Sequence, residues 1–79
     1  MGTSRKSAIK RLEGLRVQVE AHLGKMEALP NDPAVGHWRA EIRGWLAQMT
    51  DSLRHVGSRT AEDWEALLSD WAARLGDEQ

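Results

Sequence analysis

The chain has no cysteine, phenylalanine or tyrosine, and only two of its 79 residues are proline. Without cysteine, neither a disulfide framework nor a zinc site built on thiolates stabilises the fold. In a domain of this size an apolar core alone leaves a net stability of only about 3 to 5 kcal/mol. We therefore expect a single domain over residues 1–79, for which oligomerisation is the remaining source of stability.

A long apolar run is also missing. No stretch approaches the roughly 20 apolar residues that a membrane-spanning helix needs. The basic start of the chain is not followed by the apolar segment of a secretory signal. We expect a cytoplasmic protein with no membrane partner.

Recognised catalytic motifs are absent as well. The sequence has no cysteine nucleophile, no glycine-rich phosphate loop after a strand, no HExxH pattern and no glycine-flanked serine of the hydrolase type. Paired acids such as Glu62 and Asp63 fall at the expected start of a helix, where negative charge is favourable to the helix dipole. We expect no enzymatic activity, no metal and no cofactor.

Tryptophan supplies all of the large aromatic surface. The four residues form two pairs, Trp38 with Trp45 and Trp64 with Trp71, and the members of each pair are seven residues apart. Seven residues make two helical turns, so both indoles of a pair lie on one face of a helix and need an apolar neighbour. This arrangement predicts a helical bundle.

Three apolar stripes with steps of three and four residues predict an all-α protein, an antiparallel three-helix bundle with short loops. The helices are expected at about residues 7–29, 33–56 and 61–75. The expected core consists of the large apolar residues on these stripes: Leu12, Leu15, Val19, Met26, Val35, Trp38, Ile42, Trp45, Met49, Leu53, Trp64, Leu68 and Trp71.

The predicted helix ends follow from residues that stop or cap helices. Pro30 ends the first helix, and Asp32 is the expected N-cap of the second, with Pro33 at its first position. Gly57 is expected to end the second helix in a left-handed conformation. Thr60 is expected to cap the third helix.

A stripe of small residues lies opposite the tryptophan face of the second predicted helix: Gly36, Ala40, Gly44 and Ala47. The outward face of a helix normally carries charge, and an interior glycine costs about 1 kcal/mol relative to alanine. Small residues at this spacing permit the close approach of another helix. The alternative is that alanine is simply a good helix former and the glycines are tolerated.

These features predict a small helical module for protein–protein interaction, which self-associates or acts as an adaptor. The small-residue stripe and partly exposed indoles are the expected contacts with a partner protein or a second copy. Three helices do not cover four indoles completely, and we expect Trp64 and Trp71, on the shortest helix, to be the more exposed pair. A further possibility is that the third helix docks on a second chain, with residues 57–60 as a hinge.

Charge is unevenly distributed, although the formal net charge is only −1. Residues 1–29 carry six bases and three acids, and residues 58–79 carry two bases and six acids. The first and third helices are neighbours in an up-down-up bundle. Opposite charge is therefore expected to favour their packing modestly.

Four bases, Arg5, Lys6, Lys10 and Arg11, cluster where the first helix begins, although the helix dipole disfavours positive charge there. Positive charge at an unfavourable position indicates an alternative to the protein-interaction function. In this alternative the chain is an accessory protein that binds nucleic acid or another anion through the basic N-terminal helix. The other interpretation is a solvated terminus whose bases pair with nearby acids. The acidic third helix would be the recognition element of a helix-turn-helix domain, which makes nucleic acid the less favoured partner.

Two histidines fall at the same level if the first two helices form a hairpin: His22 and His37. Two imidazoles from facing helices can begin a metal site, but neighbouring Glu20, Glu41 and Lys25 do not give a recognised ligand spacing. We expect instead a hydrogen-bonded His22 at the edge of the core. Whether the two histidines approach each other stays open at this point.

Overall fold

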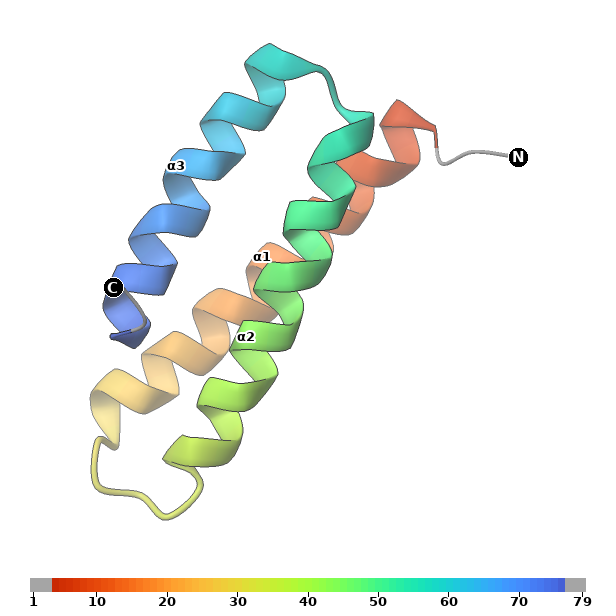
Figure 1. Ribbon diagram of the computed structural model, residues 1–79. Coiled ribbons are helices and arrows are strands. Elements are labelled where there is room, and N and C mark those ends of the chain that lie inside the picture. Colours follow the sequence, from red (N-terminus) through yellow and green to blue (C-terminus); the bar gives the residue numbers. More distant parts are fainter. Residues whose placement is uncertain (1–3, 77–79) are drawn as a thin grey trace.

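The computed structural model describes residues 4–76, which form three helices that fold back on one another (Figure 1). α1 spans Arg5–Ala28, α2 spans Val35–Ser52 and α3 spans Ser58–Leu75. One turn of 3₁₀ helix, η1 (Leu53–His55), extends α2. The described residues include no strand, so the predicted all-α bundle of three helices with short loops is confirmed.

α1 begins two residues earlier than predicted because a serine caps it. The Ser4 Oγ accepts a hydrogen bond from the Ser7 N–H at 3.1 Å, which satisfies one of the free donors of the first turn. At the other end, the Leu29 N–H donates to the Lys25 carbonyl at 2.8 Å. Pro30 has no N–H and ends the ladder there, as predicted.

The start of α2 differs from the prediction, because its N-cap is Ala34 and not Asp32. The Asp32 Oδ1 accepts a hydrogen bond from the Ala34 N–H at 2.8 Å, and the Asp32 carbonyl accepts one from the Val35 N–H at 3.0 Å. Asp32 therefore closes a turn over Pro33 ahead of the helix. The sequence does not distinguish the two cases because the same carboxylate oxygen serves an Asx turn and a helix cap.

Only two residues, Val56 and Gly57, separate η1 from α3, whereas the prediction left four, 57–60, between the second and third helices. Gly57 does not end α2 in a left-handed helical conformation; it precedes α3 as its N-cap, with φ of +83° and ψ of 155°. This backbone conformation is open only to glycine, which explains the residue. Thr60, the predicted cap, lies inside α3, so the expected hinge at residues 57–60 is largely helical. Gly76 ends α3 in the left-handed conformation.

The core fills the space between the three helices, and its members come from all of them. The predicted core residues that are buried are Leu12, Val19, Met26, Ile42, Met49, Trp64 and Trp71. The predicted core residues that are only half-buried are Leu15, Val35, Trp38, Trp45, Leu53 and Leu68. The structure adds Ala8, Leu23, Val56 and Leu75 to the buried set.

The two tryptophan pairs are covered to different extents, and the prediction chose the wrong pair as the more exposed one. Trp64 and Trp71 are 9% and 1% exposed, whereas Trp38 and Trp45 are half-buried. The physical reason is that α3 begins earlier than predicted and, at 18 residues, is as long as α2. Its indoles turn inward and are covered by their own chain, so Trp64 and Trp71 leave almost no exposed surface for the predicted partner contact.

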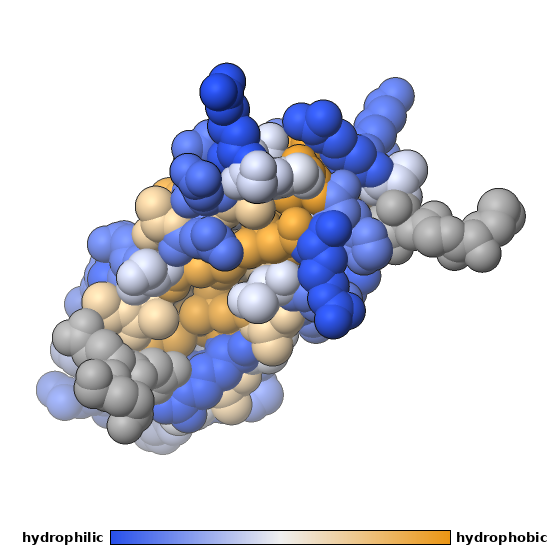
Figure 2. All heavy atoms as spheres, turned by 45° about the horizontal axis from the view of Figure 1, so that its top comes forward, coloured by the Kyte–Doolittle hydropathy of each residue, from blue (hydrophilic) through white to orange (hydrophobic). Residues whose placement is uncertain are grey.

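Apolar residues remain visible on the surface of the bundle. Figure 2 shows a band of apolar residues along the middle of one face, with hydrophilic side chains on both sides. The Cα atoms extend over 43 × 23 × 16 Å, so the bundle is elongated and thin. A thin bundle encloses few side chains on all sides, which accounts for the half-buried leucines Leu46, Leu53, Leu67 and Leu68. Within residues 4–76, no helix has both the length and the apolar composition for crossing a membrane.

Candidate interaction surfaces

The outward stripe of α2, formed by Gly36, Ala40, Gly44 and Ala47, is exposed. It lies on the side of the helix opposite the buried Ile42, and therefore faces away from the core. A Cβ atom at either glycine would have no neighbouring atom within 4 Å beyond its own helix. Packing inside the chain therefore does not require glycine at these two positions.

α1 has a comparable outward face, whose members are all exposed: Gly14, Val17, Ala21, Gly24 and Ala28. Val17, the largest apolar member of this face, is 66% exposed. A Cβ atom at Gly14 or Gly24 would also have open space around it. The helical hairpin of α1 and α2 thus carries two uncharged outward stripes.

The two histidines of the first two helices share one carboxylate. The Glu41 Oε1 lies 3.1 Å from the His37 Nε2 and 3.6 Å from the His22 Nε2. The His22 Nδ1 lies 3.1 Å from the Gln18 carbonyl oxygen, which accepts the Nδ1 proton because a carbonyl has none to donate. His22 is therefore hydrogen-bonded at the edge of the core, as predicted. The four-residue spacing of His37 and Glu41 on α2 was the sequence signal for their contact.

The same seam between α1 and α2 holds the half-buried indoles. The Trp45 and His22 rings meet edge to face, with centroids 4.7 Å apart and an interplanar angle of 87°. The Lys25 Nζ lies 5.8 Å from the centroid of the Trp38 ring, within cation–π range. Both α2 indoles therefore serve contacts with α1. Among the residues that the structure describes, no group of three side chains is arranged to hold a metal ion.

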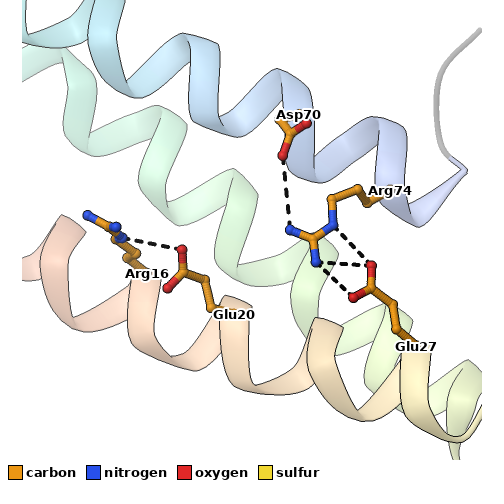
Figure 3. Close-up of polar contacts among 5 residues, drawn as sticks. All are labelled: Arg16, Glu20, Glu27, Asp70 and Arg74. Atoms are coloured by element: carbon orange, nitrogen blue, oxygen red, sulfur yellow. Dashed lines mark hydrogen bonds and ion pairs between the residues drawn. The ribbon is translucent and has the colours of Figure 1, made fainter.

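Arg74 and Arg39 form polar contacts that attach α3 to the other helices within residues 4–76. The Arg74 Nη2 lies 2.9 Å from the Glu27 Oε1 of α1, and the Arg74 Nε lies 3.1 Å from the Glu27 Oε2 (Figure 3). Asp70 lies 4.0 Å from the same guanidinium. The Arg39 Nη1 of α2 donates to the Leu75 carbonyl at 2.8 Å, which satisfies a free acceptor at the end of α3.

The ion pair between α1 and α3 has the opposite sense to their overall charges. Glu27 is an acid of the basic helix, and Arg74 is a base of the acidic helix. Arg16, a base of α1, pairs with Glu20 of its own helix at 3.4 Å (Figure 3). The excess bases of α1 and the excess acids of α3 therefore form no ion pairs with each other within the described residues.

The basic cluster of α1 lies at the surface. Arg5, Lys6 and Lys10 are exposed and form no ion pair in the part of the chain that the structure describes. The Arg11 Nη2 donates instead to the Gln48 Oε1 of α2 at 3.0 Å. The interpretation that these bases pair with nearby acids therefore does not hold for residues 4–76.

Comparisons with models of known protein families, with curated proteins and with solved structures give no match to this chain. The described residues form no pocket. The candidates for function are therefore exposed surfaces: the outward stripe of α2, the outward face of α1 and the basic start of α1.

Proposed function

We propose that the protein is a small helical interaction module that self-associates through the outward stripe of α2. The observation that supports this function best is Gly44, an interior helix glycine whose Cβ position is open. Such a glycine costs about 1 kcal/mol relative to alanine, and no contact among the described residues offsets that cost. A second helix that packs closely on the stripe accounts for it, because small residues let two helix backbones approach.

A second copy of the chain is the partner that requires the fewest assumptions. In a two-fold dimer the stripe of one copy packs on the same stripe of the other, so a single surface serves both partners. The size of the domain favours this arrangement, since the net stability of about 3 to 5 kcal/mol expected for one such core increases when a partner covers more surface. The exposed Val17 and the half-buried leucines show how much apolar surface one chain leaves uncovered.

The proposed activity is binding and not catalysis, because the sequence carries none of the recognised catalytic motifs. A cytoplasmic location stays a prediction. A chain without cysteine gains no disulfide from an oxidising compartment, which is consistent with that location.

Sedimentation equilibrium over a range of protein concentrations tests the proposal. The molar mass of the wild-type protein is expected to rise with concentration. Ala40→Lys places a long charged side chain on the stripe and is expected to give a monomer with an unchanged circular dichroism spectrum. The matched control is Ala66→Lys, which introduces the same charge at an exposed alanine of α3 and is expected to associate like wild type.

Two outcomes contradict the proposal. One is a wild-type protein that remains monomeric at every concentration. The other is a protein that associates equally well with and without Ala40→Lys, which would place the contact elsewhere.

A further inference from the structure

Bases from three elements gather at one end of the bundle. Arg11 faces Gln48 and Lys25 faces Trp38, so α1 and α2 are antiparallel and the residues after Gln48 lie beside the start of α1. α3 begins directly after η1, and its start lies at the same end of the molecule (Figure 1). We call these bases the basic end: Arg5, Lys6, Lys10, Arg54 and Arg59.

The side chains of the basic end are exposed and mostly unpaired. Four of the five form no ion pair with any residue that the structure describes. The fifth, Arg54, lies 3.5 Å from Asp51, and these two side chains are 76% and 67% exposed. A pair so open to solvent contributes little, so Arg54 is also available to a partner.

The acids at this end do not outnumber its bases. Residues 5–13 and 50–63 carry six bases and four acids, whereas residues 14–49 and 64–76 carry five bases and six acids. Neither α1 nor α3 has an acid in its first turn, although negative charge stabilises a helix there and positive charge destabilises it. Arg5, Lys6 and Arg59 lie in these first turns, so they are placed against the stability of the fold, which indicates that they serve a contact outside it.

We propose that the basic end binds the phosphate backbone of a double-stranded nucleic acid, independently of the α2 stripe. Exposed Lys and Arg side chains on neighbouring elements supply contacts to successive phosphates. Within the described residues, this end exposes no tryptophan on which the nucleobases of a single-stranded nucleic acid could stack. The large apolar residues that the described chain exposes, Val17 and Leu29, lie outside the basic end. The basic end therefore has no exposed large apolar side chain to insert into a membrane.

Fluorescence anisotropy with a fluorescein-labelled duplex DNA of mixed sequence tests the proposal on the full chain. Binding is measured over a series of salt concentrations. Each phosphate contact contributes about 0.9 to the slope of log K against log salt concentration, so five bases predict a slope of up to about −4.5. Arg54→Gln with Arg59→Gln removes the two bases that only the fold brings to this end, and is expected to reduce the size of the slope by about 2.

The matched control is the double variant Arg16→Gln with Lys25→Gln, which removes the same charge from exposed positions of α1 outside the basic end. It is expected to change the slope by less than about 0.5. Circular dichroism of each variant verifies that the helices are intact. An equal loss in the control would overturn the proposal, because net charge alone would then govern binding.

Four other results overturn the proposal. The first is the absence of duplex binding even at low salt. The second is a slope that Arg54→Gln with Arg59→Gln leaves unchanged, since the three elements would then not share one surface. The third is tighter binding to a single strand of the same length, and the fourth is binding to phosphatidylserine vesicles without binding to the duplex.

Discussion

Replacing Gly44 by alanine separates the stability of the single chain from its association. Gly44 lies inside α2, it is exposed, and an added Cβ atom would meet no atom within 4 Å. Alanine loses less backbone entropy than glycine when a helix forms, a difference of about 1 kcal/mol. The monomer is therefore expected to gain about 1 kcal/mol in its free energy of unfolding, which raises the Tm of a domain this small by roughly 4 to 8 °C.

Gly14→Ala is the matched control for this substitution. Gly14 lies inside α1, is exposed, and has the same open space around its Cβ position. In dilute solution the two variants are expected to gain the same stability. At high concentration they are expected to differ, because a Cβ atom on the α2 stripe holds a second helix away. Gly44→Ala then weakens self-association, whereas Gly14→Ala does not, because the proposed contact is the α2 stripe and leaves the outward face of α1 uncovered.

Urea unfolding followed by tryptophan fluorescence measures the stability of the monomer, and sedimentation equilibrium measures its association. A loss of stability in either variant would refute the reasoning, since it would mean that these Cβ positions are not open. If Gly44→Ala gains stability but associates as the wild type does, the proposed contact through the α2 stripe is refuted. The glycine would then be a tolerated residue, and the α2 stripe would not be the contact.

Three further predictions test how the core and the helix ends are held. Trp71 is 1% exposed, so Trp71→Ala is expected to lower the free energy of unfolding by about 3 to 5 kcal/mol. This loss is as large as the whole stability of such a domain, so the cooperative urea transition is expected to disappear. The same change at half-buried Trp38 is expected to leave a folded protein. Gly57 has φ of +83°, a conformation that costs other residues about 1 to 3 kcal/mol, so Gly57→Ala is expected to lower the urea midpoint although its Cβ position is open. Arg39→Met removes the hydrogen bond to the Leu75 carbonyl. The wild-type guanidinium is partly open to solvent, so its loss is expected to lower the free energy of unfolding by only about 1 kcal/mol. The same variant is expected to speed amide hydrogen exchange at the end of α3. A native-like Trp71→Ala, a stabilising Gly57→Ala, or unchanged exchange in Arg39→Met would contradict the corresponding argument.

The number and order of the helices and much of the core were predictable from the sequence. Apolar residues at steps of three and four define both a helix and the face that it buries, whatever its neighbours are. Leu12, Ile42 and Met49 illustrate this, since all three are fully covered as predicted. The helix ends were less predictable. Asp32 and Gly57 each have the chemistry of a helix terminus, but the first closes a turn and the second precedes α3, because turns and helices use the same side-chain and backbone features.

The candidate surfaces divide in the same way. The exposed position of Ala40 and Gly44 followed from the helical period, because a residue opposite the buried stripe faces outward in any small bundle. The contact of Glu41 with two histidines did not follow, since His22 belongs to another helix. The start of α3, which carries Arg59, lies at the same end of the molecule as the start of α1. This position also did not follow from the sequence, because it depends on the antiparallel arrangement of the helices.

The sequence by itself determined three amphipathic helices and the face that each one buries, because both properties depend on spacing within a short stretch of chain. Only the tertiary structure decided that Trp64 and Trp71 are enclosed while Trp38 and Trp45 keep an edge in solvent. It also decided which charges of different helices meet. How far a side chain is covered, and which charge it meets, depend on where a neighbouring helix lies, and no local stretch of sequence specifies that position.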